Sequence, residues 1–132
     1  MWQLSHSVEQ EVAGSLADMN LTVLQLEALA ELSMDPSLST ADLARRTFVT
    51  PQNMSLTVSK LADRGYLVRS AHATNARINR LELTARGRRV LDRGVERARR
   101  VEAQAFAALT ARERARMIAA LRLSLSRFKS RG

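Results

Sequence analysis

Two short helices separated by a bend are predicted by residues 39–65, which run STADLARR, TFVT and PQNMSLTVSKLADRG. Ser39 begins the first helix, because an aspartate follows three residues later and can complete a capping box. Thr50 begins the second helix, since its hydroxyl can cap free amides while Pro51 occupies a first-turn position that needs no N–H. Gly65 ends the second helix. Two helices joined in this way predict a helix-turn-helix.

The second of these helices has a core face and an outward face. At about 100° per residue, Met54, Val58 and Leu61 fall on one side and point to the core. The outward Gln and Asn side chains can read adenine edges in the major groove of DNA, and Leu56 can contact a thymine methyl group. An ordinary polar helix face is the alternative. The DNA contacts predicted for the motif are Ser39, Thr40, Thr50, Pro51, Gln52, Asn53, Ser55, Leu56, Ser59 and Lys60.

A β-hairpin follows the helix-turn-helix. Residues 66–69 and 80–83 are rich in strand-forming residues and predict two short strands, which the polar stretch 70–79 joins. A basic hairpin beside a recognition helix can enter the neighbouring minor groove. We therefore add Arg69, Arg77 and Arg80 to the predicted DNA contacts, although Arg69 and Arg80 also fit solvated surface positions.

The two ends of the chain carry long apolar stripes. Helices are predicted over about 3–19 and 85–109, and a last helix begins at a capping box at Thr110. The middle, 22–84, can close a small core of its own, but little is left in one chain to cover the ends. We expect one domain, 1–132, in which helices over 3–19 and 85–128 form a symmetric dimer, with a folded-back monomeric bundle as the alternative. The predicted dimer contacts are Leu4, Val8, Val12, Leu109, Met117, Leu121, Leu125 and Phe128.

The net charge of +8 is unevenly distributed along the 132 residues. Residues 1–36 carry −6, whereas 37–89 and 90–132 carry +7 each. A basic segment this biased favours a polyanionic partner, because each neutralised phosphate releases counterions. A solvated basic surface is the alternative.

Composition excludes several other classes. There is no cysteine, and the only two histidines lie far apart, so we expect no metal, no cofactor and no thiol chemistry. No apolar run reaches the length of a membrane span. With five glycines and no glycine-rich phosphate loop, the chain is not expected to be an enzyme. We expect it to be cytoplasmic.

Several motifs together resemble the multiple-antibiotic-resistance regulator (MarR) family of prokaryotic transcription factors. They are LTxxQ at 21–25, STADLARR, VTPQNM, KLADRGYLVR at 60–69 and NAR followed by LELTARGRRVL at 81–91. The resemblance implies a mainly α-helical winged helix-turn-helix with six helices and a two-stranded wing. It also implies a homodimer that binds a pseudo-palindromic operator on double-stranded DNA, often as a repressor released by a small anionic or aromatic effector. A basic architectural or RNA-binding protein without sequence specificity is the alternative function.

The resemblance also assigns roles to single positions. Arg77 matches the wing-tip arginine that enters the minor groove, and Asn75 stands where relatives usually carry an aspartate that fixes that arginine. Leu56 stands where relatives often carry a polar or basic residue. In the family, the effector pocket lies between the first, second and fifth helices and the DNA-binding lobe. Here it would be lined by Trp2, His6, Gln10, Met19, Phe48 and Arg86, although each also fits ordinary packing, a surface position or a phosphate contact.

Overall fold

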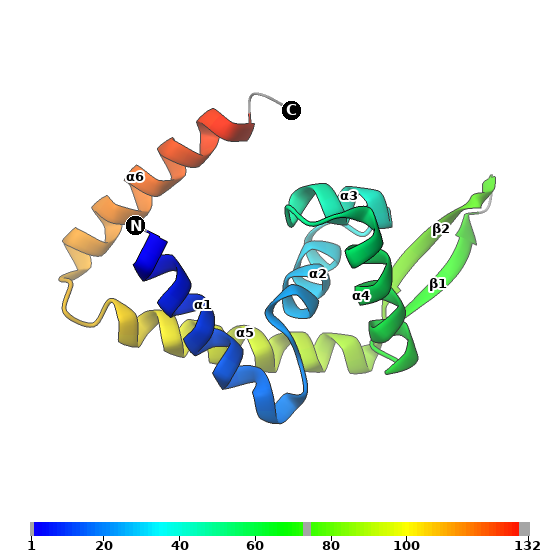
Figure 1. The fold of residues 1–132 in the computed structure, drawn as a ribbon, viewed down its shortest axis with the longest axis horizontal. Coiled ribbons are helices and arrows are strands. Elements are labelled where there is room, and N and C mark those ends of the chain that lie inside the picture. The colour runs from blue at the N-terminus through cyan, green and yellow to red at the C-terminus, as the bar shows by residue number, and fades with distance from the viewer. Residues whose placement is uncertain (1, 73–74, 130–132) are drawn as a thin grey trace.

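The computed structural model describes the backbone of residues 2–72 and 75–129, and the side chains of 2–70 and 80–128. Six helices and one antiparallel hairpin make up this part of the chain (Figure 1), as the sequence predicts for a winged helix-turn-helix. In chain order the elements are α1 (Trp2–Leu16), a 3-10 turn (Ala17–Met19), α2 (Val23–Met34), α3 (Thr40–Arg46), α4 (Pro51–Asp63), β1 (Leu67–His72), β2 (Asn75–Leu83), α5 (Ala85–Ala105) and α6 (Ala111–Lys129).

Local capping sets where the helices begin. The Ser39 hydroxyl accepts a 3.1 Å hydrogen bond from the Asp42 amide, while the Asp42 carboxylate accepts a 2.9 Å bond from the Ser39 amide. These bonds satisfy amide groups that have no partner inside the helix. Side-chain caps are present at the predicted starts Ser39, Thr50 and Thr110. Thr22 and Thr84 cap α2 and α5 in the same way.

The core lies between the helix-turn-helix, the base of the hairpin and the first half of α5. Met54, Val58 and Leu61 of α4 are completely buried, which confirms the predicted core face of that helix. They pack among other fully buried apolar side chains, which are Leu16, Leu29, Leu32, Leu43, Leu67 and Leu81.

The hairpin is longer than the sequence predicts. β1 continues to His72 and β2 begins at Asn75, so most of the polar stretch assigned to a loop lies in the strands, with Ser70 opposite Arg80. The hairpin projects away from the helices (Figure 1), so neither face of its outer half needs apolar residues. Polar composition therefore did not prevent strand formation, and the prediction of a long loop is wrong.

The fifth helix joins the two halves of the molecule. It is predicted to reach 109 but ends at Ala105, and Leu109 lies in the link to α6, where its amide donates to the Phe106 carbonyl at 3.0 Å. Near its start, Gly87 approaches the hairpin base so closely that a Cβ there would lie 1.9 Å from the Tyr66 carbonyl oxygen. Only glycine allows this approach.

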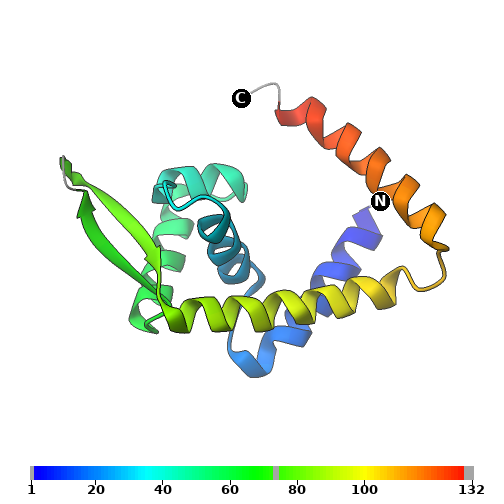
Figure 2. The ribbon, with the colours of Figure 1, turned by 180° about the vertical axis from the view of Figure 1, so that it is seen from behind.

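The N-terminal helix crosses α5 and packs against it, whereas α6 extends away from the body (Figures 1 and 2). Arg97 of α5 ties the two helices together, since it donates to the Ser15 carbonyl at 2.7 Å and pairs with Asp18. The hydrogen bond from Arg97 lowers the pKa of Asp18. Within the described part of the chain, no helix combines the length and apolar character needed to cross a membrane.

Candidate nucleic-acid interface and effector groove

The outward face of α4 is open to solvent. Gln52, Asn53 and Lys60 are exposed, as is Ser55, and Leu56 has 55% of its surface exposed. Because the opposite face of α4 is locked in the core, this helix presents its polar side in a fixed orientation. The structure thus brings together most of the residues predicted from the helix-turn-helix motif.

The two cap residues of the motif have local roles. The Ser39 hydroxyl also donates to Asp42 at 2.6 Å, and the Thr50 hydroxyl accepts from the Asn53 amide at 3.2 Å. Their side chains therefore hold the starts of α3 and α4. Thr40 is partly buried in the first turn of α3.

The hairpin arginines that the structure describes have partners within the protein. Arg69 donates to the Ser59 hydroxyl at 2.9 Å, which joins β1 to the recognition helix. Arg80 lies 3.4 Å from the carboxylate of Glu82, and both side chains are about half exposed. The first contact fixes the hairpin against α4, while the second partly offsets the positive charge of Arg80.

The wing tip carries the remaining predictions. Asn75 and Arg77 belong to β2, but their side chains lie outside the described part of the chain. The minor-groove role of Arg77 therefore stays a prediction.

The basic residues of α3 are already paired with acids. Arg45 contacts Asp42, and Arg46 lies 3.0 Å from both Glu31 and Asp35. Hydrogen bonds from Ser37, and then the charge of Arg46, lower the pKa of Asp35. The two Arg46 pairs brace α3 against α2 and its C-terminal end, and the sequence patterns did not reveal them because the partners lie more than ten residues apart.

The six predicted effector residues do not come together. Trp2 stacks on His6 with ring centroids 5.4 Å apart, and Gln10 contacts His6 at 3.1 Å, so these three form an exposed group on α1. Met19 is buried in the core, and Phe48 is 91% exposed in the turn before α4.

Arg86, the sixth of these residues, lies over the ring of Tyr66 at 5.4 Å. Arg64 stacks on the same ring at 4.7 Å and donates to the Tyr66 hydroxyl at 2.9 Å. Arg86 thus belongs to an aromatic–cation cluster near the start of α5, distant in the fold from the group on α1 (Figure 1).

A groove of about 840 Å³ lies instead between the N-terminal helix, α2, α5, α6 and the turn before α4. None of the six predicted effector residues lines it. Its apolar walls include Val8, Val12, Leu24, Leu26, Val49 and Phe106, and its acidic residues are Glu9, Glu27 and Glu102. The groove lies where the resemblance places the pocket, between the first, second and fifth helices and the lobe, but the predicted lining residues are wrong, because the actual ones come from segments far apart in the chain.

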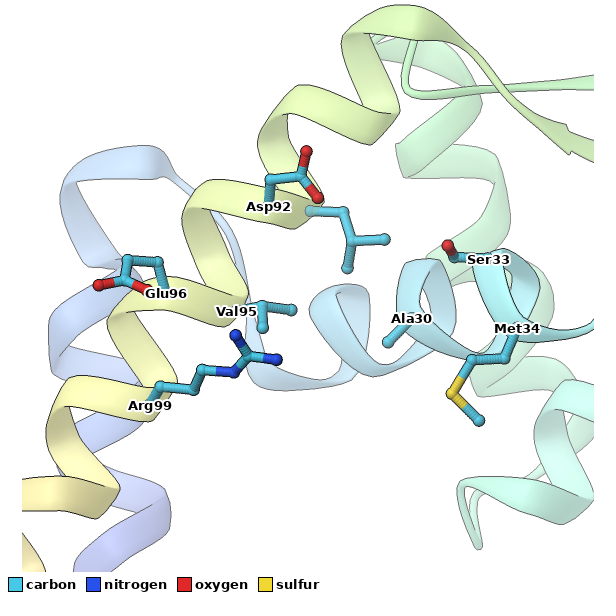
Figure 3. Close-up of a pocket in the computed structure, with 8 residues that line it drawn as sticks. Ala30, Ser33, Met34, Asp92, Val95, Glu96 and Arg99 are labelled. Atoms are coloured by element: carbon cyan, nitrogen blue, oxygen red, sulfur yellow. The ribbon is translucent and has the colours of Figure 1, made fainter.

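A second, smaller hollow of about 360 Å³ lies between α2 and α5 (Figure 3). Ala30 and Val95 face each other across it, while Asp92, Glu96 and Arg99 line its α5 side. Glu96 pairs with Arg100 at 3.1 Å. The mixed charges and shallow apolar floor give this hollow no evident chemistry, and the described residues hold no cluster of metal-binding side chains.

The predicted dimer contacts are largely uncovered in the single chain. Leu4, Leu125 and Phe128 are exposed, and so is Leu121, although Leu121 also lies at the groove. Val8, Leu109 and Met117 are partly buried. Val12 differs, because it is buried in the chain's own core, where α1 packs on α5. Its assignment to the dimer interface is therefore corrected to an intrachain packing role.

A winged helix-turn-helix with uncovered terminal helices is the class of protein that this fold defines. The MarR family model matches residues 19–78. The HTH-type transcriptional repressor Rv2887 of Mycobacterium tuberculosis is 36% identical over 111 residues, which cover 84% of this chain and 80% of that protein. The chain belongs to the MarR family.

Solved structures show the same likeness. The M. tuberculosis MarR family protein Rv2887 in complex with DNA matches with a TM-score of 0.80 at 32% identity, over 92% of this chain and 90% of that one. The same protein in complex with salicylic acid matches with a TM-score of 0.77 at 36% identity, over 91% of each chain. A MarR transcriptional regulator from Methanosarcina mazei Go1 shares the fold, with a TM-score of 0.88 at 16% identity over 98% of this chain and 94% of that one.

Proposed function

We propose that this protein is a ligand-responsive transcriptional repressor that binds double-stranded DNA as a homodimer. The observation that carries the proposal is the two-sided recognition helix, in which Met54, Val58 and Leu61 are fully buried while Gln52 and Asn53 face solvent. A net charge of +8 suits a polyanionic partner. The relative that is 32% identical over most of its length is solved in complex with DNA.

The DNA contacts follow from the arrangement of the elements. α4 enters the major groove, where its outward amides read base edges, and the hairpin reaches the adjacent minor groove through Arg77. The helix-turn-helix and hairpin, 22–84, form the DNA-binding lobe. The terminal helices of two copies hold two lobes about 34 Å apart, the rise of one duplex turn.

Ligand response follows from the position of the groove. Its walls come from the terminal helices on one side and from Thr47 and Val49, next to the start of α4, on the other. A ligand that favours one separation of the two lobes changes the population that fits the operator. We assign no catalytic activity to the chain. We place it in the cytoplasm, because the operator DNA that it would bind lies there.

Selection of bound sequences from a random duplex pool tests the proposal, followed by fluorescence anisotropy on the recovered duplex. We expect an inverted repeat, bound at least about a thousandfold more tightly than random duplex at the same salt concentration. Binding should weaken steeply with salt, since each phosphate contact releases a counterion. Equal affinity for random duplex would favour the architectural or RNA-binding alternative, and a flat salt response would exclude a phosphate-dominated interface.

A further inference from the structure

The groove has a charge opposite to that of the protein as a whole. The chain carries +8, yet three of the groove's lining residues are Glu9, Glu27 and Glu102, and none of its described lining residues is Lys, Arg or His. The carboxylates come from three different helices, α1, α2 and α5, so only the tertiary fold brings them to one cavity.

Glu27 is the groove carboxylate whose pKa is shifted. Glu27 is exposed, as are Glu9 and Glu102, but its carboxylate is partly desolvated at the edge of the groove. This desolvation raises the pKa of Glu27, and the negative charges of Glu9 and Glu31 raise it further. A carboxylate in such surroundings gains when a positive charge approaches.

Three arginines of the helices and links around the groove contact other groups. Arg46 pairs with Glu31 and Asp35, and Arg97 pairs with Asp18. Arg114, at the start of α6, donates to the Phe106 carbonyl at 3.2 Å. Within the described residues, Glu9, Glu27 and Glu102 form no ion pair of their own.

From this charge pattern we infer that the groove binds a lipophilic monocation, with its positive centre beside Glu27 and Glu9 and its apolar body against the walls. The inference rests on the proposed function and names its effector class. A volume of about 840 Å³ falls in the range of small-molecule sites, and the apolar walls at Val8, Val12 and Leu24 supply the contact area. An aromatic anion such as the salicylic acid held by the relative would meet three negative charges and no basic lining residue.

Two hydrophobic ions of equal size and opposite charge test the inference. Isothermal titration calorimetry measures the binding of tetraphenylphosphonium and of tetraphenylborate to the intact protein, with salicylate as a third probe. We expect tetraphenylphosphonium to bind at least about tenfold more tightly than either anion, despite the overall charge of +8. Tighter binding of an anion, or no binding of the cation because a second copy of the chain covers the groove, would overturn the inference.

Substitutions that remove one charge locate the site. Glu27→Gln and Glu9→Gln should each weaken tetraphenylphosphonium binding about five- to tenfold and leave tetraphenylborate binding no weaker. Glu11→Gln makes the same change in charge on α1, on a side chain that does not line the groove, and should leave the affinity for the cation unchanged. Equal losses in all three variants would indicate a general charge effect and would refute the assignment.

The inference and the proposed function fail separately. Operator binding of the unliganded protein, measured by anisotropy on the same preparations, tests only the proposed function. If the unliganded protein binds its operator and the cation does not bind the groove, the effector class is wrong and the repressor function stands. If the cation binds but no operator is recovered, the groove assignment stands without a regulatory role.

Discussion

The DNA-binding lobe and the C-terminal helix differ in how far their apolar side chains are buried within the chain. In the lobe, Leu29, Leu32 and Leu43 keep 1% or less of their surface exposed. In α6, Leu123 and Phe128 are 71% and 73% exposed, and no described residue is buried. The lobe therefore buries its apolar side chains in a core that Leu16 of α1 and Val90 and Leu91 of α5 complete. The apolar side chains of α6 have no such cover within the chain. Exposed apolar area on this scale is typical of an obligate interface.

The first prediction tests whether the exposed apolar side chains of α6 form the dimer interface. Changing Leu121 and Leu125 together to Glu should weaken dimerisation by at least about a hundredfold, because a symmetric dimer loses four apolar contacts, each contributing about 1.5–3 kcal/mol. Sedimentation equilibrium measures the change, and operator binding should be lost with it. Met34→Glu is the matched control, since Met34 is 76% exposed on α2. A wild-type protein that stays monomeric at micromolar concentration would contradict the dimer itself.

The second prediction tests how tightly the lobe is packed. Gly87→Ala should lower the free energy of unfolding by at least about 2 kcal/mol, because the new methyl group meets the Tyr66 backbone and cannot be accommodated without moving it. Urea denaturation measures the loss. Gly14→Ala is the control, since no atom lies within 4 Å of its Cβ position, and it should stabilise the helix by up to about 1 kcal/mol. Equal effects of the two changes would mean that α5 does not lie against the hairpin base.

A third prediction separates recognition from assembly. Arg77→Ala should weaken operator binding by about 1–3 kcal/mol, the usual cost of losing an arginine contact to DNA, and should leave the dimer intact. Anisotropy and sedimentation on one preparation measure both quantities. Arg122→Ala removes the same charge from α6, far from the lobe, and should leave operator affinity nearly unchanged. An unchanged affinity in the Arg77 variant would refute the wing role.

The smallest expected effect concerns a single cap within the lobe. Hydrogen bonds from Ser39, and then the charge of Arg45, lower the pKa of Asp42. A carboxyl whose pKa is lower in the folded state stabilises the fold above its ordinary pKa, and this contribution disappears as pH falls through the lowered value. Ser39→Ala should therefore cost about 1 kcal/mol at neutral pH and return the pKa of Asp42 toward its ordinary value. An NMR titration of the Asp42 carboxyl measures its pKa, and a pKa that stays low in the Ser39 variant would contradict the cap. Ser7→Ala, on the exposed surface of α1, is the control and should leave the pKa of Asp42 unchanged.

A region could be predicted from the sequence where its structure depends on residues close together in the chain. The starts of α2, α3 and α4 were predictable, because a cap such as Thr22 with Gln25 acts across three residues. The core face of α4 was predictable from the helical period alone. The length of the hairpin was not, because 70–72 and 75–79 belong to the strands without any apolar alternation to mark them. The six effector residues were transferred from a family outline, and the structure groups Trp2, His6 and Gln10 on α1 but places the other three elsewhere.

The sequence by itself determined the helix-turn-helix, its two-sided recognition helix and the need for something to cover the C-terminal stripe, since each depends on neighbours within a turn or two. Only the tertiary structure decided that Val12 belongs to the chain's own core and that Arg46 pairs with α2. It also decided which residues line the groove, among them Glu9, Glu27 and Glu102. The reason is physical: contacts between distant segments depend on how whole helices pack, and no local pattern in the chain records that packing.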